Sequence, residues 1–147
     1  KDGELNLQDS YATSDYNKGF KFLGGGSGLV STIRDYAIFC NMLVNNGKHG
    51  RHQVIKPETL QQMFTDQLAG VAGGFQFGLG FAIDNFKIGA GSSSRMAKSY
   101  AWSGYASTTF QVIPELKLVN IVVQQQVPTY DVLGNTLSAQ LREGLSL

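Results

Sequence analysis

Apolar residues recur along residues 33–44 with the period of an α-helix. The face that they form consists of Ile33, Tyr36, Ala37, Cys40, Leu43 and Val44. Thr32 and Asp35 stand at its start with the spacing of a capping box, with aspartate in place of glutamate. Asn-Asn-Gly at residues 45–47 supplies a left-handed stop. A second helix is predicted from Pro57, because proline at the first turn lacks only an N–H that would be unpaired anyway.

A strict alternation of apolar and polar or small residues follows, and it predicts a β-strand over residues 75–83. Its apolar positions are Phe75, Phe77, Leu79, Phe81 and Ile83. Three further strands are expected near residues 98–103, 106–113 and 117–125. A hairpin turn at residues 114–117 joins the last two, with no helix between residues 106 and 123.

Leu133, Leu137 and Leu141 indicate a terminal helix, and we expect Thr129 to be its N-cap. The resulting fold class is α+β: helices on one side of an antiparallel sheet whose last three strands form a meander. The chain then divides into an extended Gly-rich lead over residues 1–30, a helical segment over 31–70, and a sheet with a C-terminal helix over 75–147.

Composition narrows the functional classes. The 147 residues suffice for one domain or part of one. The net charge is +1 and no Lys/Arg cluster is present, which argues against nucleic acid as a partner. No apolar run approaches the roughly 18 residues that a membrane span requires. Because the chain opens with Lys1 and lacks a starting methionine, we expect it to begin inside a longer protein.

Most of the candidate chemical groups have a simple structural explanation. His49 and His52 lie between the two predicted helices, where solvated turn residues are expected. Cys40 falls on the apolar helix face and is expected to be an inert core residue. Two histidines and one distant cysteine are too few ligands for zinc. The glycine-rich stretch at residues 24–28 lacks the lysine of a phosphate-binding loop, so we interpret it as a flexible entry to the first helix.

Trp102-Ser103-Gly104 has two interpretations. On periodicity alone it is a buried tryptophan followed by a glycine at a strand end. However, the order and spacing of three segments support a second interpretation. These segments are the Gly-rich loop and capped helix at residues 24–36, Phe-Gly-Leu-Gly-Phe at residues 77–81, and the strand pair at residues 100–115. In this order and spacing they resemble the C-terminal half of the serine β-lactamase and esterase family, which includes class C β-lactamases, penicillin-binding proteins and related carboxylesterases.

The resemblance implies a site. Members of this family carry Lys-Thr-Gly, Trp-Gly-Gly or His-x-Gly on the strand beside the nucleophile, and Trp102, Ser103 and Gly104 occupy that signature as substrate-binding residues. The backbone N–H of Tyr105 would then be one of two oxyanion-hole donors. Trp102 replaces the lysine of the lactamases and removes a cation that holds a substrate carboxylate, which favours the esterase-like branch. No metal or organic cofactor is implied.

Two family motifs are absent. No serine here has a lysine three positions later, and the Tyr-x-Asn or Tyr-x-Ser motif is missing upstream of the Gly-rich segment. Both would precede Lys1. The chain is therefore expected to be the C-terminal portion of a serine hydrolase that cleaves a small-molecule ester or amide through a seryl acyl-enzyme, and to be inactive alone.

The resemblance alone suggests a periplasmic or secreted protein. The partner expected for this chain is the missing N-terminal half, in the same or another chain, or a second copy of itself. The alternatives are a non-catalytic binding or interaction module derived from this fold, or one half of a two-chain enzyme.

Overall fold

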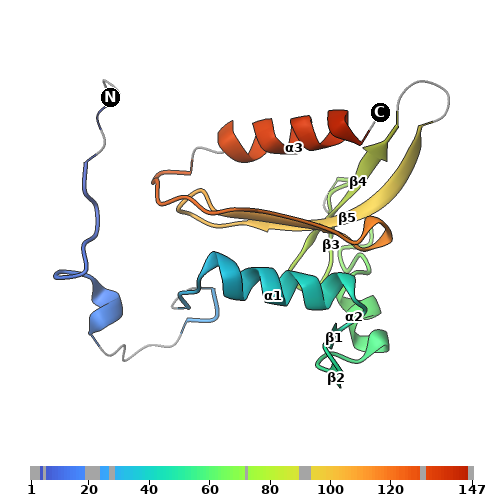
Figure 1. Ribbon diagram of the computed structural model, residues 1–147, viewed down its shortest axis with the longest axis horizontal. Helices are drawn as coiled ribbons and strands as arrows, with labels where there is room; N and C mark the ends of the chain where they lie inside the picture. The colour runs from blue at the N-terminus through green and yellow to red at the C-terminus, as the bar shows by residue number, and fades with distance from the viewer. Residues whose placement is uncertain are drawn as a thin grey trace. The chain divides into compact units, whose positions relative to one another are not determined.

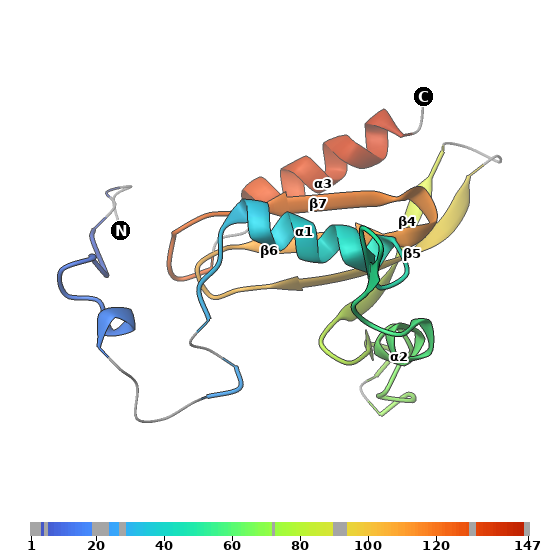
Figure 2. The same cartoon turned by 60° about the horizontal axis from the view of Figure 1, so that its bottom comes forward.

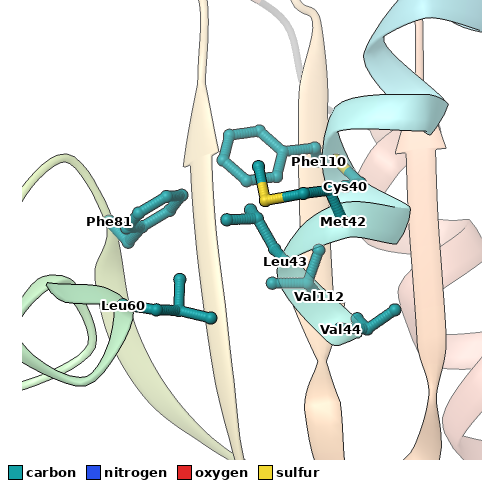
Figure 3. Packing of buried hydrophobic residues seen from close by; sticks show 8 residues of the cluster. All are labelled: Cys40, Met42, Leu43, Val44, Leu60, Phe81, Phe110 and Val112. Atoms are coloured by element: carbon teal, nitrogen blue, oxygen red, sulfur yellow. The ribbon is translucent and has the colours of Figure 1, made fainter. Parts of the chain in front are cut away.

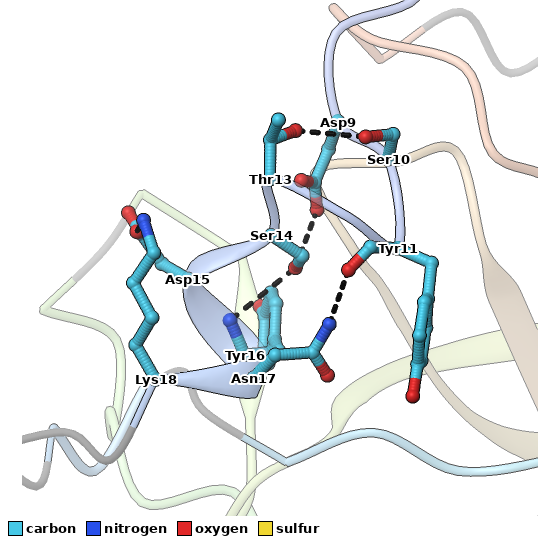
Figure 4. A network of polar contacts seen from close by, with 9 residues as sticks. All are labelled: Asp9, Ser10, Tyr11, Thr13, Ser14, Asp15, Tyr16, Asn17 and Lys18. Atoms are coloured by element: carbon cyan, nitrogen blue, oxygen red, sulfur yellow. Dashed lines mark hydrogen bonds and ion pairs between the residues drawn. The ribbon is translucent and has the colours of Figure 1, made fainter.

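The computed structural model describes residues 4, 6–18, 24–26, 29–71, 73–89, 94–129 and 132–145. They belong to two compact units, residues 1–31 and 32–147. In the first unit the described residues form one 3₁₀ turn, η1 (Asp15–Asn17). Ser14 fixes this turn, because its hydroxyl donates to the Asp9 carboxylate at 2.9 Å and accepts from the Tyr16 N–H at 3.3 Å (Figure 4).

The second unit is built on an antiparallel sheet. Its five strands pair in the order of the chain: β3 (Gln76–Phe77), β4 (Ala82–Ile88), β5 (Arg95–Ser103), β6 (Thr109–Ile113) and β7 (Leu118–Val122). The helices are α1 (Ile33–Val44), α2 (Pro57–Met63) and α3 (Val132–Gly144), and a separate small hairpin consists of β1 (Lys48–His49) and β2 (His52–Gln53) (Figure 1). The α+β class and the meander are therefore confirmed.

Helix α1 begins and ends where the sequence predicts. The Thr32 hydroxyl accepts from the Asp35 N–H at 3.1 Å and donates to the Asp35 carboxylate at 2.9 Å. At the other end, Asn46 and Gly47 adopt positive φ angles of 56° and 79°. Local residue chemistry thus determines both ends of this helix.

The helices cover both faces of the sheet, so the expectation that they lie on one side is wrong. Figures 1 and 2 show α1 against one face and α3 against the other. Phe110 and Val112 of β6 pack with α1 and α2 in the main core (Figure 3). Ile113, next along the same strand, packs with Phe86 and with Leu141 of α3. Because successive strand residues point to opposite faces, β6 presents an apolar surface on each side that needs cover.

The single strand predicted over residues 75–83 is also wrong, because a tight turn divides it into β3 and β4. The Gly78 N–H donates to the Phe81 carbonyl at 2.8 Å, and Gly80 has a φ of 93°. The two strands then pair antiparallel, with Phe77 opposite Ala82. Alternating phenylalanines satisfy a strand pattern, but the two glycines between them reverse the chain.

One further connection differs from the predictions. The turn between β6 and β7 is a short 3₁₀ segment, η3 (Pro114–Leu116), followed by Lys117 at a φ of 51°. Proline fixes φ near the helical value, which suits such a turn. Helix α3 is described from Val132, so the N-cap predicted at Thr129 depends on residues 130–131, which lie outside the described part of the chain. The Thr129 hydroxyl donates to the Tyr105 carbonyl at 2.8 Å.

Cys40 lies in the core, as predicted, with no exposed surface. Burial raises the pKa of its thiol to about 12, so the thiolate is scarce at neutral pH. We expect Ellman's reagent at pH 8 to label the folded chain at least about a hundredfold more slowly than the chain unfolded in urea. Rapid stoichiometric labelling of the folded chain would show that the α1 face is open.

Candidate functional site

The candidate site lies where β5 ends. Trp102 pairs with Phe110 and Ser103 with Thr109 across β5 and β6. Paired residues share a face, so Trp102 lies on the α1 side with Phe110, whose ring contacts Tyr36 at 5.2 Å. Ser103 lies on the opposite side. The Trp102 side chain is 48% exposed, so the interpretation of it as a buried core tryptophan is wrong.

The loop that follows β5 is closed by its own backbone. The Gly104 N–H donates to the Thr108 carbonyl at 2.8 Å, and the Ser107 N–H donates to the Gly104 carbonyl at 3.1 Å. Ser107 has no exposed surface and a φ of 65°, and its hydroxyl donates to the Gln126 carbonyl at 2.9 Å. The loop therefore has a fixed shape and is tied to the chain segment after β7.

Tyr105 stands at the outer side of this loop. Its side chain is 75% exposed, and Thr129 holds its carbonyl. Among the described residues, the Tyr105 N–H has no hydrogen-bond partner. A backbone donor in a fixed loop, without a hydrogen-bond partner in the described part of the chain, is the element that an oxyanion hole requires.

Gly104 has a local reason to be glycine. A Cβ at this position would lie 2.5 Å from the Thr108 hydroxyl oxygen. The resemblance makes Gly104 a substrate-binding residue, whereas the close approach that the structure shows at this glycine is within the loop itself. Any larger residue at position 104 therefore acts first on the shape of the loop.

Sequence reasoning missed two aromatic residues beside Trp102. The Phe77 ring meets the Trp102 ring edge to face at 4.8 Å, and Phe75 stacks on Phe77 at 6.0 Å. We call Phe75, Phe77 and Trp102 the aromatic strip. The signal in the sequence was Phe-x-Phe just before the Gly78 turn, but only the pairing of β3, β4 and β5 brings these rings to Trp102.

Of two cavities among the described residues of this unit, the larger is not at the signature. It has a volume of 660 Å³ and lies among α1, α2 and the β6–β7 turn, where Phe64 and Lys117 are among its lining residues. The smaller cavity, 370 Å³, lies under α3 and reaches Trp102 and Ser103. Its walls include Gln111 of β6 and Arg142 of α3. The signature therefore borders the smaller cavity.

Among the described residues of this unit, the tyrosines with shifted pKa values and the two histidines supply no evident base at the signature. Burial raises the pKa of Tyr36 and of Tyr100, so both phenols are protonated at neutral pH. His49 and His52 face one another across the exposed β1–β2 hairpin, as solvated residues. Within the described part of the chain, no three metal-ligating side chains gather, and no helix is long and apolar enough to cross a membrane.

The sequence matches the beta-lactamase family over residues 2–143, nearly its whole length. The chain belongs to the beta-lactamase family. This membership confirms the resemblance drawn from the motifs and supports a serine-hydrolase-type superfamily.

The relatives are considerably longer. The chain is 28% identical over 140 residues to "Protein Rv1367c" of Mycobacterium tuberculosis strain ATCC 25618 / H37Rv and to "Uncharacterized protein MT1414" of strain CDC 1551 / Oshkosh. Each match covers 82% of this chain and 35% of the relative. The chain thus spans about a third of the length of these relatives.

A solved structure shares the fold. The chain is similar to the crystal structure of a "putative beta-lactamase" from Bacteroides dorei DSM 17855, with a TM-score of 0.54 and 18% sequence identity. The similarity covers 79% of this chain and 40% of that one. A similarity at 18% identity indicates a shared fold and does not indicate a shared reaction.

Proposed function

We propose that residues 1–147 are the C-terminal portion of one beta-lactamase-like domain, in a serine hydrolase of the esterase-like branch. The observation that carries this proposal is the unpartnered Tyr105 N–H, which follows Trp102-Ser103-Gly104 on a braced loop. The nucleophilic serine of Ser-x-x-Lys and the tyrosine motif belong to another part of the protein, in the same or a second chain.

The chemistry assigned to this portion is stabilisation of charge. When the nucleophilic serine adds to the substrate carbonyl, negative charge develops on the oxygen. The Tyr105 N–H and the N–H of the nucleophile itself donate to this oxygen, and each such donor is worth about 3 kcal/mol. The acyl–oxygen bond then breaks, the alcohol leaves with a proton, and water hydrolyses the acyl-enzyme.

The substrate class follows from the residue that opens the signature. Trp102 offers an aromatic surface where a lysine would hold a carboxylate. The substrate proposed is therefore a small neutral ester or amide, with Trp102, Ser103 and Gly104 along its binding site. No cofactor takes part in this reaction scheme.

The test compares two lengths of protein. We expect the 147-residue chain alone not to hydrolyse p-nitrophenyl acetate or a chromogenic β-lactam above background, because it lacks Ser-x-x-Lys. The longer protein that includes an upstream Ser-x-x-Lys should hydrolyse the ester. Turnover by the short chain, with one serine labelled by a fluorophosphonate, would refute the proposal, and Ser103 would be examined first since Ser107 is buried. An inactive longer protein would favour a non-catalytic module.

A further inference from the structure

We propose that the aromatic strip is a subsite for an uncharged aromatic ring of the substrate. This inference rests on the proposed function, because it assigns a substrate class to the same site. Its occupant is an aryl group carried by a neutral ester, lying against Trp102 while the ester carbonyl faces the Tyr105 N–H.

The geometry of the strip is that of a partly built ring stack. Phe77 is the half-buried centre, with Trp102 edge to face at 4.8 Å and an interplanar angle of 78° on one side. Phe75 lies on the other side at 6.0 Å and 30°. Such pairs hold their rings in fixed orientations, and a further ring gains both area burial and ring–ring attraction.

The outer rings of the strip retain free surface. Phe75 is 51% exposed and Trp102 is 48% exposed, although both contact Phe77. The surface is thus ordered by its neighbours and still open to a ligand. An aryl group placed there removes apolar area from water without displacing a side chain.

The charge around the strip favours a neutral ring. In the described part of the chain, the cation over an aromatic ring is Arg142, which lies over Phe86 on the α3 face. Lys98 of β5 is engaged elsewhere, because its ammonium donates to the Gln76 side chain at 3.3 Å. Among the described residues, no cation lies over the Trp102 ring in the position of the lactamase lysine, and Arg142, which reaches the smaller cavity, lies over Phe86 instead.

The position of the strip links it to the reaction. Trp102 precedes Tyr105 by three residues, and the loop between them is fixed by the Gly104 and Ser107 hydrogen bonds. An ester whose carbonyl oxygen reaches the Tyr105 N–H therefore has one substituent beside Trp102. A ring there is held against rotation, which reduces the entropy lost at the transition state.

The chain contains one tryptophan, so its indole N–H gives a single NMR resonance that reports on the strip directly. The 147-residue chain is titrated with benzyl acetate, with ethyl acetate and with the phenylacetate anion. We expect a saturable shift of the Trp102 indole signal with benzyl acetate, and binding roughly tenfold weaker for ethyl acetate. The proposal is overturned if the Trp102 indole signal does not shift with benzyl acetate, or if phenylacetate binds more tightly than benzyl acetate.

Two variants serve as a matched pair. Phe75→Ala removes an exposed ring of the strip and should weaken benzyl acetate binding roughly fivefold. Met96→Ala removes a similarly exposed apolar side chain, 61% accessible, from the far end of β5 and should leave binding unchanged. Equal effects of the two variants contradict a specific subsite. If the shift of the Trp102 indole signal disappears when the protein is diluted, the shift reports self-association, and this result also contradicts the subsite.

Binding and catalysis separate the two proposals. Binding to the strip needs no nucleophile. If benzyl acetate binds but the longer protein is inactive, the subsite proposal is supported and the hydrolase proposal is refuted. In an active longer protein, Phe75→Ala should lower kcat/KM for benzyl acetate and leave that for ethyl acetate unchanged. If the longer protein is active and Phe75→Ala leaves the ratio of kcat/KM for benzyl acetate to that for ethyl acetate unchanged, only the subsite proposal is refuted.

Discussion

Replacing Gly104 with valine is expected to lower kcat/KM of the longer, active protein by about two orders of magnitude, the loss that follows removal of one oxyanion donor. A Cβ at Gly104 would lie 2.5 Å from the Thr108 hydroxyl oxygen, and valine adds two methyl groups beyond it. The loop must move to accept them, and Tyr105 is its next residue. A shift of about 1 Å in a catalytic group is enough to cost this much in rate.

The measurement is the steady-state kinetics of p-nitrophenyl acetate hydrolysis, with thermal unfolding as a check that each variant is folded. Gly104→Ala and the double variant Gly104→Ala with Thr108→Ala form the control pair. Thr108→Ala removes the hydroxyl that the new Cβ would meet, so the double variant should recover most of the activity lost by Gly104→Ala. Unchanged kinetics in Gly104→Val would show that the signature is structural and that the site assignment is wrong.

The parts of the fold that the sequence predicts are those controlled by neighbouring residues. Thr32 and Asp35 cap α1 through contacts three residues apart, and Asn46 and Gly47 end it through their own backbone angles. The meander follows from three runs of alternating residues with turn residues between them. In each case the deciding interaction lies within one turn of helix or one hairpin.

The parts that the sequence does not predict depend on distant partners. The Thr129 hydroxyl donates to the Tyr105 carbonyl, which is 24 residues away in the chain, and no local pattern indicates this contact. The side of the sheet that α3 covers is decided by which face Ile113 and Phe86 leave open. A one-dimensional pattern identifies that a helix has an apolar face, but not which sheet face receives it.

The candidate site shows the same division. Trp102, Ser103 and Gly104 can be found from the sequence because a family signature is contiguous. Phe77 cannot, because its contact with Trp102 arises from the pairing of β3 with β4 and of β4 with β5. The misassigned strand at residues 75–83 hid this, since it placed Phe77 and Phe81 in one continuous segment.

The turn that corrected this assignment also leads to the largest expected loss of stability. Gly78→Ala should lower the free energy of unfolding by about 3 kcal/mol, at the upper end of the usual cost of overpacking. The new Cβ would lie 2.0 Å from the Met63 carbonyl oxygen and 3.3 Å from that of Thr65. Both are backbone atoms at the end of α2, so no side-chain rotation relieves the contact.

Relief requires the turn to separate from α2, and this separation has a further cost. The Leu79 N–H donates to the same Met63 carbonyl at 3.0 Å, so the movement breaks a hydrogen bond as well. Urea unfolding followed by circular dichroism measures the loss. Gly144→Ala is the control, because a Cβ there has no neighbour within 4 Å and alanine suits a helix better than glycine. If Gly78→Ala has the same free energy of unfolding as Gly144→Ala, the β3–β4 turn does not pack on α2. Since the same turn brings Phe77 to Trp102, the variant should also weaken benzyl acetate binding, whereas Gly144→Ala should not.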